Sequence, residues 1–502
     1  MKRYILCAWA ALYILAVGCD DFLAKEPTKS SAQKVETLDD LDAILNEPMG
    51  RYNNSLHMQQ GGYADFYCTD NAEIPLETFK TYESNFSMDE LLHYLWQTTT
   101  DFTMDTYWNS CYSAVWTANL IINSVGGMAG DEVQKNNLKA EAHALRAYKY
   151  FALAQTYCLH YTEATAGEPG LPLRTGTDFE ESLERATLAE TYALIESDLK
   201  EALKISVPFA GKRWRASRAS VNALAARYYL YRGNYTEAEK YANLALKEFG
   251  ELIDYTTIGT YLYNTYNVSL GNGGERQQEV YYPNTFRNTE AQDLNWAEQY
   301  QTEVETNSAW RILPSMELLE LYRQYPHDLR YDLFMVEGYM NRTKPSEHSW
   351  YGYVFLANGT IYSGPSVAEM YLVRAECKAR NNDIPGCMTD VETVRAKRFA
   401  AENYQKLPEP ADRKAAVQVV LDERRREAPF ALRWMDLRRL TSDDLMEPVT
   451  VKRKFWPLGD NKVNAEAELQ EYVLSPDSRT YARPLGKDVI NLSGGQTVQN
   501  RY

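Results

Sequence analysis

The stretch from Ser217 to Phe249 constrains the fold of this chain more than any other. Small apolar residues recur in it at steps of three and four, namely Ala223, Ala226, Leu230, Ala238, Ala242 and Ala245. Each half of the stretch is therefore predicted to be a helix with one small, apolar face. Between the halves, Gly233 suits the end of a helix and Asn234 suits the cap or turn that follows. Because small faces allow two helices to approach closely, the sequence predicts a tight antiparallel hairpin.

The spacing of glycine, tyrosine and alanine in this hairpin resembles a tetratricopeptide repeat, whose unit is about 34 residues long. One such unit cannot bury its own apolar face, so further copies are expected. Ser366 to Phe399 aligns with the first hairpin at a constant offset. In this alignment Asn382 takes the place of Gly233, and Cys387 takes the place of Ala238, as a small core residue.

A third unit is interrupted. Glu141 to Cys158 has the pattern of another first helix, and Leu188 to Leu203 that of its second helix, after an insertion rich in glycine and proline. The chain is therefore predicted to be all-α, with a tetratricopeptide-like scaffold that carries long loop-rich insertions and a few short strands. Repeat helices are expected over about 134–249 and 365–430. Long insertions in compact proteins usually carry function.

The amino terminus indicates the compartment. Lys2 and Arg3 precede an apolar run from Tyr4 to Val17, which Gly18 and Cys19 close. The run is too short to span a bilayer and has the charge layout of a secretory signal. A cysteine after a small residue at the cleavage point is the arrangement of bacterial lipoproteins, and the alternative is a secreted protein with an incidental cysteine. We expect a signal peptide over 1–18 and acylation of Cys19, whose two or three chains would hold the protein on a membrane.

The net charge and the sequence motifs limit the classes of function that we expect. A net charge of −16 argues against nucleic-acid binding, which requires a basic surface. The sequence has no H-E-x-x-H, no G-x-S-x-G and no glycine-rich phosphate loop, and none of the six histidines has another within four residues. Paired carboxylates of a glycosidase are not singled out by any segment. We therefore expect a protein that is not an enzyme and has no cofactor or metal.

Tyrosine is unusually frequent, with 38 tyrosines against 15 phenylalanines and 10 tryptophans. Aromatic rings with polar neighbours suit sugars, because ring faces cover sugar C–H surfaces. Trp296, Tyr300 and Trp310 lie in the insertion over 250–364 at a spacing that is not helical, so they form either an exposed sugar platform or packing for the loop. Trp108 and Tyr112 keep a helical spacing and are expected in the core. Trp96 precedes that helix in a polar segment and is expected to be more exposed.

The run from Arg424 to Arg439 contains six arginines and interleaved acids. A phosphate or nucleic-acid patch is one interpretation, but paired charges on a helix and its exit turn are favoured. Short strands are expected at Glu279 to Tyr282 and Trp350 to Leu356, and an irregular segment over about 440–502.

Several segments, taken in order, resemble the SusD/RagB family of surface lipoproteins. They are CDDFLAKEP after the anchor, the run from Trp108 to Asn119, EAHALRAYKYFALAQTY, LPSMELLELY with HDLR, VAEMYLVRAE, ERRREAPFALRWMDLRR, and YARPLGKDVI with the final QNRY. The resemblance covers essentially the whole mature chain. It implies a single SusD-like domain over 38–502, with four tetratricopeptide-like repeats, behind a tether over 19–37.

The resemblance also implies a function. Members of the family capture nutrients, typically glycans, for a TonB-dependent (SusC-like) outer-membrane transporter, over which they act as a lid. The protein is then expected on the outer membrane, lipid-anchored through Cys19 and facing the cell exterior, with an oligosaccharide ligand. The loops that supply ligand contacts in the family point to Tyr67, Asp70, Trp96, Trp296, Tyr300 and Trp310. Peptide capture by the same architecture, and a repeat scaffold that binds only a protein partner, are the alternatives.

Overall fold

The computed structural model describes residues 35–46, 58–59, 68–98, 105–209, 211–269, 273–287, 297–306, 313–337, 351–354, 360–459 and 462–502. The expected signal peptide over 1–18 and most of the tether over 19–37 lie outside these residues. Within them, no helix combines the length and the apolar character that crossing a bilayer requires.

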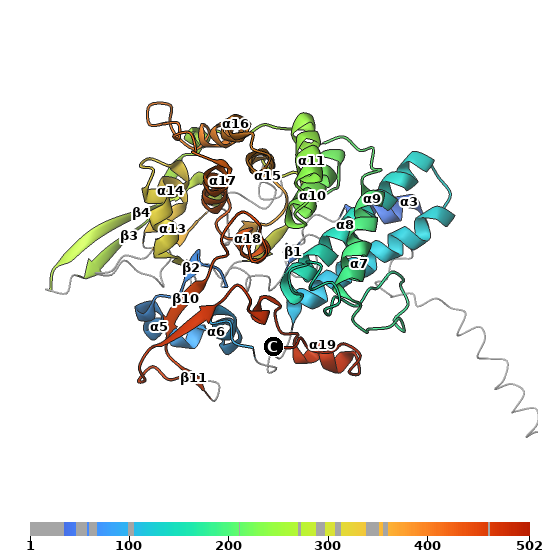
Figure 1. The fold of residues 1–502 in the computed structure, drawn as a ribbon, viewed down its shortest axis with the longest axis horizontal. Helices are drawn as coiled ribbons and strands as arrows, with labels where there is room; N and C mark the ends of the chain where they lie inside the picture. Colours follow the sequence, from blue (N-terminus) through green and yellow to red (C-terminus); the bar gives the residue numbers. More distant parts are fainter. Residues whose placement is uncertain are drawn as a thin grey trace, which may run out of the picture.

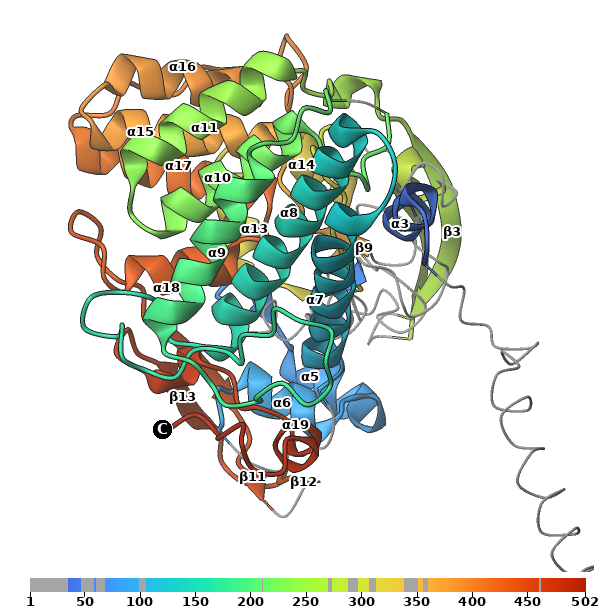
Figure 2. The same ribbon diagram turned by 90° about the vertical axis from the view of Figure 1, so that its right-hand side faces the viewer.

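Helices dominate the fold, as predicted. A succession of long helices packs side by side through one half of the molecule (Figures 1 and 2). They are α7 (Thr106–Ser124), α8 (Glu132–Tyr157), α9 (Leu188–Ala202), α10 (Arg218–Tyr231), α11 (Tyr235–Glu248), α15 (Val367–Arg380), α16 (Ile384–Arg395) and α17 (Arg413–Glu427), and the shorter α18 (Arg433–Leu440) follows α17. The predicted all-α, tetratricopeptide-like scaffold is thereby confirmed.

The central hairpin of α10 and α11 forms as the sequence predicts. Gly233 lies in the turn with a φ of +68°, a left-handed conformation that glycine adopts without a Cβ clash. Asn234 caps α11, since its side chain accepts a hydrogen bond from the backbone N–H of Glu237. The alanines of both helices are fully buried in one cluster with residues of α15. The small faces therefore serve contacts between repeats as well as within one.

The hairpin of α15 and α16 repeats this geometry. Asn382 has a φ of +64° at the position aligned with Gly233, and asparagine is one of the few side chains that tolerates this region. Cys387 and Ala238 are both fully buried, so the thiol fills a small core position. The alignment of the two segments therefore predicted that both turns have the same backbone conformation.

The helices α7, α8 and α9 form a third layer around a large aromatic core. Trp108 is buried there against Tyr157 and Tyr112, which confirms the expected core role of Trp108 and Tyr112. Buried Arg146 donates to Asn119 of α7 at 2.7 Å and to Asp198 of α9 at 2.8 Å. These hydrogen bonds fix the spacing of the three helices.

The insertion over 250–364 is more regular than expected. β3 (Thr260–Ser269) and β4 (Glu275–Pro283) form a long antiparallel hairpin, which projects from the body in Figure 1. The prediction of a short strand at Glu279 to Tyr282 with irregular chain before it was therefore wrong in extent. Both faces of β3 carry polar or tyrosine residues, so the sequence shows no alternation of apolar and polar side chains that would predict a strand. The strand forms because β3 pairs with β4.

Other described strands are short and pair segments far apart in sequence. They are β1 (Met58–Gln59), β2 (Ala72–Glu73), β5 (Val304–Thr306), β6 (Leu313–Pro314), β7 (Met335–Glu337), β8 (Tyr351–Tyr353), β9 (Thr360–Tyr362), β10 (Val451–Phe455), β11 (Leu458–Gly459), β12 (Lys462–Val463) and β13 (Gln470–Leu474). β1, β5 and β9 form a three-stranded sheet, and the others form two-stranded ladders. The segment over 440–502, expected to be irregular, contributes β10 to β13 and α19 (Lys487–Leu492).

Short helices complete the molecule. They are α3 (Leu38–Leu45), α5 (Leu76–Tyr82), α6 (Met88–Tyr94), α13 (Met316–Arg323) and α14 (Leu329–Phe334). One of them, α3, packs against the repeat helices α7 and α8. A second core joins α5, α6 and α13 to β10, with Phe79 and Phe455 in edge-to-face contact at its centre. The described parts of these segments are therefore packed on an apolar cluster of their own.

Candidate functional site

Four predicted site residues lie outside the described residues: the anchor Cys19 and the aromatics Tyr67, Trp296 and Trp310. Their roles stay predictions. The other three, Asp70, Trp96 and Tyr300, are described, and each proves to be buried.

Asp70 is 8% exposed and pairs with arginine. Its two carboxylate oxygens accept from Arg433 at 2.7 and 2.5 Å, and Arg425 lies 3.4 Å away. Burial alone would raise the pKa of Asp70, but the guanidinium groups of Arg433 and Arg425 outweigh it and lower the pKa to about 2. The carboxylate is thus engaged within the protein, where it joins α18 to the segment before β2. This geometry does not support the predicted ligand role.

Trp96 is 6% exposed, so its expected exposure was wrong. The indole Nε1 donates to the carbonyl of Cys68 at 3.0 Å, and the guanidinium of Arg453 lies 4.5 Å from the ring centroid. Both contacts come from residues distant in sequence, which a local polar context cannot reveal. The ring offers no open face for a sugar.

Tyr300 is 1% exposed, which also contradicts the expected platform. Its hydroxyl donates to the carbonyl of Phe249 at 2.5 Å, and its backbone N–H donates to Pro365 at 2.9 Å. The ring packs among residues of α10, α11 and α15. Tyr300 therefore fastens the insertion to the repeat helices.

An open groove of about 450 Å³ lies between β2, the start of α13, and β10. Its lining is mixed: polar residues such as Asp70, Glu73, Ser315, Glu317, Lys452 and Lys454 lie beside apolar ones such as Ile74, Leu76, Met316 and Val451. Burial raises the pKa of Glu73 on its edge. Carboxylates, hydroxyls and ammonium groups supply the acceptors and donors that a hydroxylated ligand needs.

The groove joins two segments that sequence reasoning singled out. Ala72 pairs with Pro314 and Glu73 pairs with Leu313 in the antiparallel ladder of β2 and β6. The described residues that follow Tyr67 and those that follow Trp310 therefore meet at this groove. Glu73, Glu317 and Lys452 were missed by the sequence analysis, since charged residues this common carry no local signal of a shared groove.

A second, more enclosed cavity of about 70 Å³ lies between α10, α15 and α17. Among the residues described around it, Gln299 Oε1 and Arg424 Nη1 have no hydrogen-bond partner. At about 10–15 Å³ for each water, the cavity has room for about five molecules that would satisfy such atoms. A sugar ring would need more space than this cavity offers.

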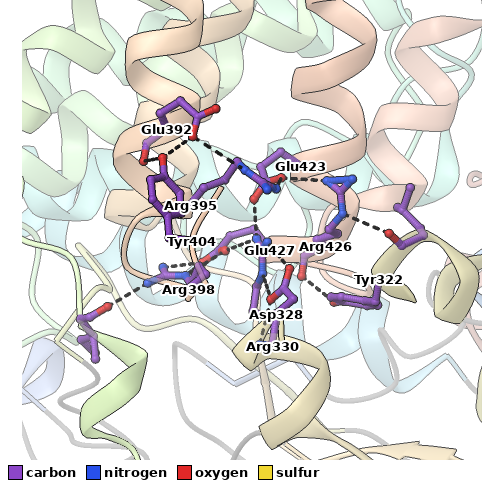
Figure 3. Close-up of polar contacts among 12 residues, drawn as sticks. Tyr322, Asp328, Arg330, Glu392, Arg395, Arg398, Tyr404, Glu423, Arg426 and Glu427 are labelled. Atoms are coloured by element: carbon purple, nitrogen blue, oxygen red, sulfur yellow. Dashed lines mark hydrogen bonds and ion pairs between the residues drawn. The ribbon is translucent and has the colours of Figure 1, made fainter. Parts of the chain in front are cut away.

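Beside the cavity, which Glu427 lines, buried charges tie the insertion to the repeats (Figure 3). Glu423 of α17 meets Arg330 and Arg426 at 2.7 Å and Arg395 at 3.2 Å. Glu427 and Arg398 pair at 2.6 Å. Burial would raise the pKa of Glu423, but its three arginines hold the pKa far below the usual range.

The arginine run therefore forms paired charges, as favoured from the sequence. Arg424 and Arg439 both contact Asp436, and Arg433 contacts Asp70. Arg424, Arg433 and Arg439 are buried with their carboxylate partners and are therefore unavailable to a nucleic-acid backbone. Within the described part of the chain, histidine, cysteine and carboxylate side chains do not gather in a group of three or more that could hold a metal ion.

The fold and the groove define a class: a tetratricopeptide-like helical scaffold whose insertions build a separate, grooved half. Two family models match the chain, one described as "Starch-binding associating with outer membrane" over residues 21–230 and one described as the SusD family over residues 366–502. The chain belongs to the SusD/RagB family. A comparison with curated proteins gave no match.

Solved structures share the fold. A SusD superfamily protein from Bacteroides thetaiotaomicron has 18% identity and a TM-score of 0.64, over 93% of this chain and 100% of that chain. A putative sugar binding protein from Bacteroides vulgatus has 19% identity and a TM-score of 0.62, over 93% and 99%. A SusD-like carbohydrate binding protein from the same species has 15% identity and a TM-score of 0.60, over 92% and 98%. At these identities the likeness concerns the fold.

Proposed function

We propose that this protein is a cell-surface lipoprotein that binds oligosaccharides and delivers them to a TonB-dependent outer-membrane transporter. The observation that carries the proposal is membership of the SusD/RagB family, with models matched near both ends of the chain. The description of one model as starch-binding, and the names of two structural neighbours as sugar or carbohydrate binding proteins, support a glycan as the ligand.

The groove beside β2 and β6 supports binding of a polar, hydroxylated ligand. Its volume of about 450 Å³ falls in the range of small-molecule sites. Trp296 and Trp310 are the aromatic residues that we propose to stack on the sugar. Trp310 lies three residues before β6 in the sequence, and β6 borders the groove. Binding without a chemical reaction is proposed, because the sequence carries no catalytic motif.

Transfer to the transporter follows from the anchor. A shallow site leaves one side of a sugar chain in water, so we expect micromolar to millimolar affinity, about −8 to −4 kcal/mol. Acylation at Cys19 would tether the protein near the transporter. The tether would raise the effective concentration of the protein at the transporter that it covers. Closure of the lid would then cover the exposed side of the ligand and add contacts. With this arrangement, a ligand that is bound only weakly can still be transferred to the transporter.

Calorimetry with oligosaccharides and with peptides tests the ligand class. Alanine at Trp296 or Trp310 should weaken glycan binding by about 1–3 kcal/mol, the scale of losing a large apolar contact, while the melting temperature stays unchanged. Val133→Ala, an exposed apolar truncation on α8, is the control for changes unrelated to the ligand. Binding of peptides but of no glycan would refute the sugar and favour the peptide-capturing alternative.

Extraction from native membranes in a gentle detergent tests the partner. The protein should co-purify with a large outer-membrane barrel, and uptake of the ligand should need both. Deletion of residues 22–31, which shortens the tether, should impair uptake more than binding. Isolation as a lone monomer, with uptake unaffected by its loss, would refute the lid.

A further inference from the structure

An exposed aromatic pair lies away from the groove, on the outer side of α7. Trp116 is 38% exposed and Phe179, from the loop between α8 and α9, is 80% exposed. Among the described residues, no other tryptophan or phenylalanine is as exposed. The two rings touch as a near-parallel pair, with centroids 6.4 Å apart and planes 16° apart.

The loop that carries Phe179 is fastened to α7, across which it runs in Figure 2. Asn119 Nδ2 donates to the carbonyls of Arg174 and Gly176 at 3.1 and 2.9 Å. Asn123 Nδ2 donates to the carbonyl of Thr175 at 3.0 Å, and Trp116 Nε1 donates to that of Thr177 at 3.3 Å. Four hydrogen bonds from three side chains of α7 therefore hold the loop at each residue from Arg174 to Thr177, just before Phe179.

The turn around Phe179 is also fixed from within. Glu181 accepts from Arg174 Nε and from the backbone N–H of Gly176, both at 2.8 Å. Asp178 Oδ1 accepts from the backbone N–H of Glu180 at 2.9 Å. Since the loop backbone and the Trp116 indole are fixed before any ligand arrives, less conformational entropy is lost on binding than for a mobile loop.

The apolar area of the pair indicates whether it suits a small ligand or a protein partner. Large aromatic side chains bury about 150–250 Å² each when fully covered, so this partly exposed pair can contribute at most about 300 Å². A stable protein interface takes about 800 Å² from each partner. The neighbours of the rings, Ser113, Asp178 and Glu180, are exposed polar residues that do not extend the apolar area. A small ligand fits this patch better than a protein surface does.

The chemistry of the surroundings identifies the class of ligand. Ring faces cover the C–H face of a pyranose with equatorial hydroxyls, and the hydroxyl and carboxylates nearby can exchange hydrogen bonds with its rim. The carboxylates of Asp178 and Glu180 disfavour an anionic sugar. We propose that Trp116 and Phe179 form a second carbohydrate platform, which takes one or two neutral, glucose-like units of a glycan. This inference rests on the proposed function only in taking a glycan as the ligand.

Titration calorimetry of the full chain in detergent with maltoheptaose, cellohexaose and xylohexaose tests the platform. Phe179→Ala should weaken binding to this platform about tenfold without a change in melting temperature, because the ring is exposed. Phe179→Tyr should restore binding, and Val133→Ala should behave as the wild type. Trp116→Ala should remove the quenching of tryptophan fluorescence that the ligand causes at this site.

The outcomes separate the two proposals. Glycan binding that is lost in Trp296→Ala and Trp310→Ala, but unchanged in Phe179→Ala and Trp116→Ala, would overturn the second platform alone. Unchanged glycan binding with loss of co-purifying barrel in Phe179→Ala would assign the pair to a protein contact and also overturn it. If the wild type binds none of the three sugars, this platform is refuted, and the proposed function fails if the wider glycan panel also shows no binding.

Discussion

Replacing Asp70 by asparagine separates a structural role from a ligand role at one position. In the folded protein the pKa of Asp70 falls from 3.8 to about 2, because the attraction of Arg433 and Arg425 exceeds the effect of burial. At 1.36 kcal/mol for each pKa unit, this shift corresponds to about 2 kcal/mol of stability at neutral pH. The Asp70→Asn variant also leaves the buried guanidinium of Arg433 without its anion, and breaking such a pair costs about 3–5 kcal/mol. A loss of about 2–5 kcal/mol is therefore expected.

The dependence on pH has a definite sign. The pKa of Asp70 is lower in the folded state, so the stabilisation is complete above the unfolded value near 3.8 and is lost as the pH falls toward about 2. The difference in unfolding free energy between wild type and Asp70→Asn should thus be constant near neutral pH and shrink below about pH 4. Urea unfolding followed by circular dichroism at a series of pH values measures it.

Glu468→Gln is the matched control, because this exposed carboxylate should show no comparable loss. A variant Asp70→Asn with unchanged unfolding free energy but a glycan affinity reduced tenfold or more would refute the reasoning. In that case Asp70 would be a ligand residue after all, and its pairing with Arg433 would contribute little to stability.

Three further predictions address the network, the repeat turn and the anchor. Glu423→Gln should lower the unfolding free energy by about 3–5 kcal/mol in urea unfolding, because three buried arginines lose their shared anion; a loss below 1 kcal/mol would contradict it. Gly233→Ala should cost about 1–2 kcal/mol at its positive φ, whereas Gly167→Ala, in open space at an ordinary φ, should cost less; equal effects would argue against strain. Cys19→Ala should abolish metabolic labelling with a fatty acid and release the protein from membranes, and equal labelling of both forms would exclude lipidation.

Local sequence determined the repeat scaffold. The alanine spacing, Gly233 with Asn234, and the aligned Asn382 predicted two helical hairpins and their turns. Helix faces, caps and turns depend on residues within a few positions of one another, so a periodic pattern is sufficient to predict them. The core positions of Trp108 and Cys387 followed from the same periodicity.

The tertiary structure decided which aromatic rings are exposed. Trp96 is buried because Cys68 and Arg453 reach it from distant segments. Tyr300 is buried among the repeat helices, where its hydroxyl donates a hydrogen bond to the backbone carbonyl of Phe249. Trp116 immediately follows Val115 on a helix that was predicted to lie in the core. Its exposed ring lies beside Phe179 because a loop some sixty residues further along the chain crosses this helix. Burial of a side chain is the sum of contacts from the whole chain, whereas periodicity reports only the face of its own element. The same reason made Asp70 an internal ion pair, since its partner Arg433 stands 363 residues further along the chain.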